Sequence, residues 1–126
     1  MLKKILGREQ KDKVFIIGFH VKPMENTIMP PDMDGAYVDC FCMGNTYEDA
    51  AKNSLDKLAK DGLYPEEVLE SVLEMEIEQW STYVKDRWPD YLDGILAQQD
   101  FETTVRSGGV VYGPFTGYNP RQNENT

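Results

Sequence analysis

The chain has 126 residues, and its 22 acidic and 13 basic side chains give a formal net charge of −9 and a pI near 4.5. This length predicts one domain, and a hydrophobic content of 40% suffices for a core without disulfides or metals. The acidic balance argues against binding to nucleic acid or to an anionic membrane surface, both of which need a basic footprint. No apolar run approaches the ~20 residues of a membrane-spanning helix.

The first twelve residues combine a short basic segment with alternating charges, so we expect a flexible arm over 1–12 and no secretory signal. Alternating apolar residues predict a strand over 13–22, with Phe15, Ile17 and Phe19 on one face. The other face begins with Val14 and Ile16 and is also apolar. We therefore expect a central strand that is covered on at least part of its second face.

A second strand is predicted over 36–43, after a loop that ends in the turn signal Asp34-Gly35. Cys40 and Cys42 share one face of this strand, with parallel side chains that suit a disulfide poorly. We expect two free thiols and a cytoplasmic protein.

A helix is predicted next, with Thr46 as N-cap, Asp49 at the third helical position and Gly62 just after its end. Small and apolar residues recur between them at helical spacing: Ala50, Ala51, Ser54, Leu55, Leu58 and Ala59. This helix is expected to dock on the small-residue face of the second strand.

Two periods compete over residues 66–80. A helix would align five apolar side chains, but it would also stack four glutamates at i,i+4 spacing, namely Glu66, Glu70, Glu74 and Glu78. A strand would alternate Leu73, Met75 and Ile77 with glutamates. We favour a strand over 68–79 and keep the helix as the alternative.

The remaining segments predict a helix over 81–99 that is broken at Pro89, a connection over 101–106, a short strand over 110–112 and an irregular flap over 115–118. A polar tail over 119–126 is expected to be disordered. The order β-β-α-β-α-β defines a single α+β domain over 13–118. We expect one small antiparallel or mixed sheet with two helices on one face, and a ferredoxin-like variant has this order.

Few residues suggest chemistry. His20 is the only histidine and is interpreted as structural, although a neighbouring Cys40 or Cys42 would make a base and nucleophile pair. The one-residue spacing of the cysteines does not match structural zinc sites. The three aspartates of 32–39 lack the glycine and terminal glutamate of a calcium loop. We expect no catalytic residue, no metal and no cofactor.

Two resemblances bear on function. The run Gly44-Asn45-Thr46-Tyr47-Glu48-Asp49-Ala50-Ala51-Lys52-Asn53 resembles the strand-to-helix corner of HicB-type antitoxins, which carry Gly-Asp-Thr followed by acidic residues, Ala and Asn. In size, acidity, compact α+β order and lack of catalytic residues, the chain also resembles small bacterial immunity proteins that neutralise a cognate toxin. The second resemblance implies that the chain covers a basic partner, such as a toxin nuclease, by charge complementarity.

The glutamate run is either a solvated face or an acidic surface for a basic partner. We interpret the chain as a non-enzymatic binding protein of the immunity or inhibitor kind. The alternative is a small regulatory or ligand-binding domain whose pocket His20 and the cysteines line or flank. Exposed edge strands would also permit a homodimer. The residues expected to contact the partner are Glu70, Glu74, Glu76, Glu78, Asp32 and Asp34, with Trp88 and Tyr118 as exposed anchors.

Overall fold

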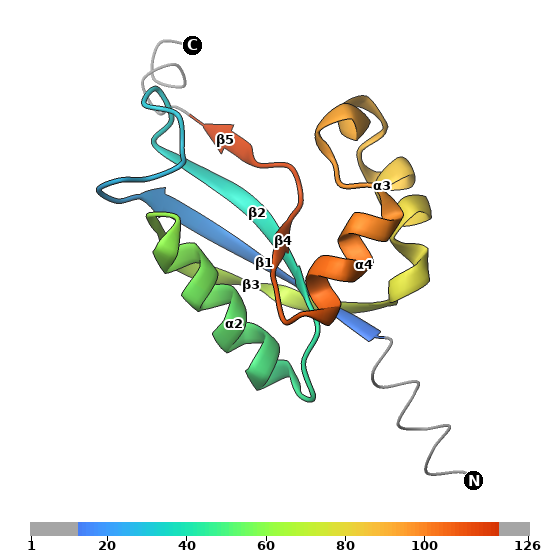
Figure 1. Cartoon of the computed structure of the whole chain (residues 1–126). Helices are drawn as coiled ribbons and strands as arrows, with labels where there is room; N and C mark the ends of the chain where they lie inside the picture. The colour runs from blue at the N-terminus through green and yellow to red at the C-terminus, as the bar shows by residue number, and fades with distance from the viewer. Residues whose placement is uncertain (1–12, 119–126) are drawn as a thin grey trace, which may run out of the picture.

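The computed structural model describes residues 13–118, except for the side chains of residues 70–72. The predicted arm over 1–12 and the predicted tail over 119–126 lie outside the described residues. Within this range the chain combines a five-stranded antiparallel sheet with helices, which confirms the α+β class (Figure 1).

The elements follow one another as β1 (Lys13–Pro23), β2 (Gly35–Cys42), α2 (Tyr47–Lys60), β3 (Leu63–Glu76), η1 (Ile77–Gln79), α3 (Trp80–Arg87), η2 (Pro89–Gly94), α4 (Gln98–Arg106), β4 (Val111–Tyr112) and β5 (Thr116–Tyr118). The strand order is β3-β1-β2-β4. β4 and β5 pair with opposite ends of β2 on the same side.

β1 lies between β2 and β3, so it is an inner strand as predicted. Its residues Ile17 and Phe19 oppose Cys40 and Val38 on the side that α2 covers, which we call the α2 face. Val14 and Ile16 point to the other side and join a separate cluster that contains Phe41, Trp80 and Phe101. We call that side the aromatic face. The two apolar sides of β1 therefore become two separate cores.

α2 has the ends that the sequence predicts. The Thr46 hydroxyl accepts a hydrogen bond of 3.1 Å from the Asp49 N–H. Gly62 follows the C-cap with a φ of +72°, and a Cβ at this position would lie 2.5 Å from the Cα of Thr27. Only glycine satisfies both conditions. Figure 1 shows α2 along the strands, away from α3 and α4.

β3 is a strand, so the helical alternative for this segment is wrong. It runs antiparallel to β1, and five consecutive pairs join residues 13–17 to residues 72–76. The strand begins earlier and ends earlier than predicted, because residues 77–79 form the 3-10 helix η1. Pro65 lies inside the strand; an edge strand tolerates proline when the missing N–H would face away from the neighbouring strand.

The C-terminal half differs most from the prediction. Residues 98–106 form the helix α4, although 101–106 was expected to be a connection. Pro89 does occupy the first turn of a new helix, but η2 is a 3-10 helix. The expectation of two helices on one face is also wrong, since residues of α3 and α4 pack on the aromatic face. The physical reason is that Val14 and Ile16, on the second side of β1, are apolar and are buried by these helices.

The predicted strand over 110–112 is confirmed as β4, while the predicted irregular flap forms the short strand β5. Among the described residues, no helix combines the length and apolar character needed to cross a membrane.

Candidate functional site

The acidic residues predicted to bind a partner lie at two ends of the sheet. Glu76 pairs with Lys13 at the start of β1, whereas Asp34 adjoins the start of β2, where Ala36 pairs with Val21. Positions 13 and 21 are eight residues apart, which is about 26 Å at the rise of a strand. Asp32 and Asp34 therefore do not form one patch with Glu74, Glu76 and Glu78 at the C-terminal end of β3 and just beyond it. The side chain of Glu70 is not among those described.

β3 is the edge of the sheet, with β1 as its neighbour. Along it, Glu66, Glu67 and Glu74 are exposed, and Glu78 is exposed just beyond its end. Exposed apolar side chains lie between these glutamates: Tyr64, Val68 and Leu73 are each about half exposed (52%, 46% and 45%). The β3 edge, which has no second neighbouring strand among residues 13–118, therefore combines acidic groups and exposed apolar side chains and is the candidate interaction surface.

The two predicted aromatic anchors are half-buried. Trp88 packs against Phe41 and Tyr83, with ring centroids 6.1 and 5.9 Å away. Tyr118 is the last residue of β5 and lies against His20. Both rings are on or beside the aromatic face, and neither adjoins the glutamates at the C-terminal end of β3.

His20, on β1, contacts residues of three other strands, β5, β2 and β3. Its Nε2 lies 2.7 Å from the Tyr118 hydroxyl, its ring stacks on Tyr37 at 4.8 Å, and its Nδ1 lies 3.7 Å from a Glu67 carboxylate oxygen. These contacts hold the short strand β5 and the edge strand β3 to β1. The geometry supports the interpretation of His20 as a structural residue.

The cysteines lie on the other side of the sheet from His20. The Cys42 thiol donates to the carbonyl oxygen of Ala50 at 3.2 Å and lies 3.5 Å from the Ser54 hydroxyl. Burial raises the pKa of both thiols, and in Cys40 the neighbouring Cys42 raises it further. Since His20 lies on the opposite face of the sheet, the base and nucleophile pair does not form. Buried thiols of raised pKa react slowly.

Asp39 and Arg87 form a polar contact that sequence reasoning missed. The guanidinium lies 3.8 Å from the carboxylate and 5.6 and 5.5 Å from the ring centres of Tyr83 and Trp88. Burial raises the pKa of Asp39, and Arg87 opposes that shift. A groove of about 200 Å³ lies beside the pair, next to Tyr37. In the sequence, the one indication of this contact is Asp39, a carboxylate that interrupts an apolar side of the predicted strand β2.

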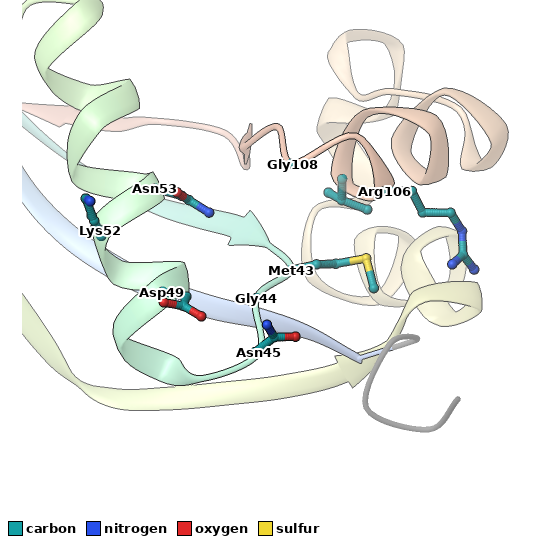
Figure 2. Close-up of a pocket in the computed structure, with 9 residues that line it drawn as sticks. Met43, Gly44, Asn45, Asp49, Lys52, Asn53, Arg106 and Gly108 are labelled. Carbon is teal, nitrogen blue, oxygen red and sulfur yellow. The ribbon is translucent and has the colours of Figure 1, made fainter. Parts of the chain in front are cut away.

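A larger cavity of about 560 Å³ lies between the first turns of α2 and the end of α4. Figure 2 shows that its polar residues come from the β2–α2 corner, from α2 and from α4. They are Asn45, Asp49, Lys52, Asn53 and Arg106. This corner is the segment that resembles HicB-type antitoxins. Neither the cysteines nor His20 line the cavity, so the pocket expected around them is not the one found.

The described residues contain no cluster of three or more His, Cys, Asp or Glu side chains arranged to hold a metal ion. Comparison of the chain with models of protein families, with curated proteins and with solved structures gives no match. The function proposed below is therefore argued from the sequence and the geometry.

Proposed function

We propose that this chain is a non-enzymatic acidic binding protein, of the inhibitor or immunity kind, that binds a basic protein partner along the edge of β3. We expect it to act in the cytoplasm, because both cysteines are free thiols. The observation that carries the proposal is an edge strand of 14 residues that presents glutamates and exposed apolar side chains together.

The charge along this edge is one-sided. Residues 63–79 contain six glutamates and no Lys or Arg. On the neighbouring strand β1, Lys13 lies 3.7 Å from Glu74, and Lys22 pairs with Tyr64 at the other end of β3. An exposed ion pair of this kind contributes little, so it leaves the edge strongly acidic. A basic partner would gain both faster encounter and selectivity from this field.

The backbone of β3 offers a second kind of contact. An edge strand carries N–H and C=O groups that point away from the sheet and can pair with an added strand. The segment 72–76 is the most regular part of β3, because its five residues pair with β1 without a register shift. An extended basic segment could add here, with alternate side chains near Leu73 and Glu74.

The test compares two variants of equal charge. Glu74→Lys with Glu78→Lys reverses two exposed carboxylates at the β3 edge, whereas Asp56→Lys with Asp86→Lys makes the same change on the exposed sides of α2 and α3. Tagged wild-type protein and both variants are used to retain partners from the source-cell lysate at low and high salt. We expect one basic protein to be retained by wild type and by the control, to be lost with the β3 variant, and to weaken with salt.

Two further measurements decide the finer parts of the proposal. Amide hydrogen exchange in residues 72–76 should slow in the complex if a strand is added. Titration of the chain into the activity of the retained protein should inhibit it at an equimolar ratio if the chain is an inhibitor. Retention of the same protein by both charge variants would count against the β3 edge as the site.

The cavity between α2 and α4 favours a second candidate, a small ligand-binding domain. Its volume of about 560 Å³ falls in the range of small-molecule sites, and amide, carboxylate and basic groups line it. This candidate predicts thermal stabilisation by a small molecule that is lost in Asn53→Leu. A metabolite screen without a thermal shift, combined with retention of a basic protein, would select the first candidate.

A further inference from the structure

A second surface lies at the opposite edge of the sheet from β3, where η2 faces the connection between β4 and β5. A cavity of about 620 Å³ opens here, and we call it the η2 pocket. The residues that matter for the argument are Asp90, Tyr91, Asp93, Ile95, Tyr112 and Phe115. The pocket has no role in the function proposed above.

The walls of the η2 pocket are aromatic. The rings of Tyr112 and Phe115 lie 5.4 Å apart at an interplanar angle of 80°, so they form a corner. Tyr91 is 60% exposed and Phe115 is 38% exposed, so both offer ring surface to a ligand. The Tyr112 ring packs against the core of the α2 face and its hydroxyl bonds to Asp61, so Tyr91 and Phe115 are the rings that the pocket leaves exposed.

The charge of the η2 pocket has one sign. Asp90 and Asp93 are exposed at its border, and none of the described lining residues is Lys, Arg or His. Aromatic faces carry a negative quadrupole, so the rings and the carboxylates favour the same kind of ligand. The molecule itself supplies an example, since the Lys57 ammonium lies 5.7 Å from the ring centre of Tyr112. Lys57 also lies 3.1 Å from Asp61, so its own charge is compensated.

The pocket is held in shape by backbone contacts. The Gly113 N–H donates to the carbonyl oxygen of Asp39 at 2.8 Å, and a Cβ on Gly113 would come within 2.9 Å of the Trp88 ring. On the other wall, the Tyr91 N–H donates to the carbonyl oxygen of Trp88 at 3.0 Å. The backbone of Gly113 and of Tyr91 is thus tied to neighbours on the aromatic face, and the Tyr112 side chain is held by Asp61 on the α2 face. A ligand therefore needs to order little of the pocket backbone.

We propose that the η2 pocket binds an organic cation, an alkylammonium or guanidinium group. The cation lies against the exposed rings of Tyr91 and Phe115, with the carboxylates of Asp90 and Asp93 at the opening and with Tyr112 packed against Phe115. The chemistry is that of aromatic sites that recognise lysine side chains and quaternary ammonium groups.

The first experiment titrates tetramethylammonium and the isosteric neutral tert-butanol into the protein and follows the ring resonances of Tyr91 and Phe115 by NMR. We expect tetramethylammonium to bind about tenfold tighter than tert-butanol, because the two are similar in size and only tetramethylammonium carries a positive charge. Equal affinities would overturn the proposal, since the pocket would then be merely apolar.

Variants separate the rings from the carboxylates. Tyr91→Phe should keep the affinity within about twofold, whereas Tyr91→Leu should lose about fivefold or more. Asp90→Asn with Asp93→Asn should weaken binding and reduce its salt dependence, and Asp56→Asn with Asp86→Asn, on α2 and α3, serves as the control of equal charge. Tyr91 is exposed, so the fold should survive, and backbone amide spectra check this. Equal binding by Tyr91→Leu and Tyr91→Phe would contradict a cation–π site.

A third experiment distinguishes a cation on a protein side chain from a free quaternary ammonium compound. Acetylated Gly-Lys-Gly amide is compared with the same peptide carrying Nε-acetyl-lysine, and with tetramethylammonium. Tighter binding of the lysine peptide assigns the cation to a protein side chain, and tighter binding of tetramethylammonium assigns it to a free quaternary ammonium compound. The absence of any shift with all three probes would refute the proposal. Glu74→Lys with Glu78→Lys should leave these affinities unchanged, which keeps this test separate from that of the β3 edge.

Discussion

The α2 face and the aromatic face of the sheet are built in different ways. The α2 face gathers its core from the nearly contiguous segment 17–63, with small and aliphatic side chains under a capped helix. The aromatic face collects residues between 14 and 111, and its helices α3 and α4 lack side-chain N-caps. The aromatic face is therefore covered by several short helices, whereas a single longer helix covers the α2 face. Polar contacts occur on both faces: the Asp39–Arg87 pair and the His20 contacts lie on the aromatic face, and the Asp61–Tyr112 hydrogen bond lies on the α2 face.

The largest expected effect concerns the centre of the aromatic face. Trp80 stacks on Phe101 at 3.9 Å, meets the Phe41 ring at 4.9 Å, and donates from Nε1 to the carbonyl oxygen of Leu96 at 2.8 Å. Trp80→Ala should cost about 3–5 kcal/mol in the free energy of unfolding, because it leaves a cavity and an unpaired carbonyl. Urea denaturation measures this cost.

Leu58→Ala provides the matched change on the α2 face, where Leu58 is fully buried. We expect it to cost about 2–4 kcal/mol, which is less than the tryptophan because no hydrogen bond is lost. A larger loss in Leu58→Ala than in Trp80→Ala would show that the α2 face carries most of the stability.

Two aspartates should give the two faces opposite dependence on pH. For Asp61, at the end of α2, burial alone would raise the pKa, but the hydrogen bond from Tyr112 at 2.7 Å and the Lys57 ion pair hold it below its usual value. Its stabilisation is therefore present above the unfolded pKa near 4 and is lost as the pH falls through the folded pKa. For Asp39, on the aromatic face, burial raises the pKa. The stabilisation that its protonated form contributes to the fold is therefore present at low pH and is lost as the pH rises through the folded pKa.

The measurement is the free energy of unfolding of Asp61→Asn and Asp39→Asn between pH 3 and pH 7. Asp61→Asn should lose about 1.5 kcal/mol at pH 7, the lower end for a hydrogen bond to a charged group, and less at pH 3. The difference in the free energy of unfolding should have the opposite pH dependence for Asp39→Asn. This variant should become more stable relative to wild type as the pH rises. Parallel pH profiles for the two variants would contradict the difference between the faces.

The α2 face was predictable because its signals are local. Thr46 and Asp49 mark the start of α2 and Gly62 marks its end, each within three residues of the helix terminus, and the alternation in 13–22 marks β1. The strand character of β3 followed from its alternating glutamates, but its ends did not, because η1 and Trp80 are drawn onto the aromatic face by tertiary contacts. Local pattern cannot show where such contacts override it.

The aromatic face was harder to predict for the same reason. α4 was missed although Phe101 and Val105 have helical i,i+4 spacing, because they are its only large apolar residues. The contact of His20 with Tyr118 spans 98 positions in the sequence, and no local rule connects them. The acidic edge of β3 is a run of glutamates in the sequence and could be predicted from it. The η2 pocket forms only where η2 and the β4–β5 connection lie close together in the fold, so the sequence alone does not indicate it.

Helix caps allow a reciprocal pair of substitutions. Thr46→Ala removes the hydroxyl that caps α2 and should cost about 1 kcal/mol. Ala97 has the extended backbone of an N-cap, with φ −63° and ψ 158°, but no side chain that can cap α4. Ala97→Thr should therefore gain up to about 1 kcal/mol. Chemical denaturation measures both, and a cost in both variants would show that capping does not distinguish the two faces.

The smallest effect concerns two tyrosines of the aromatic face that should respond differently to loss of the hydroxyl group. The Tyr118 hydroxyl bonds to His20, so Tyr118→Phe should cost about 1 kcal/mol. The Tyr83 hydroxyl is buried and has no hydrogen-bond partner among the described residues, and burial raises its pKa. Tyr83→Phe keeps the ring against Phe41 and removes an unpaired polar group, so the stability should stay the same or rise by up to about 1 kcal/mol. The free energies of unfolding from urea titration decide the sign. A loss of 1 kcal/mol or more in Tyr83→Phe would show that this hydroxyl is bonded in solution, and the aromatic face would then be better satisfied than its contacts indicate.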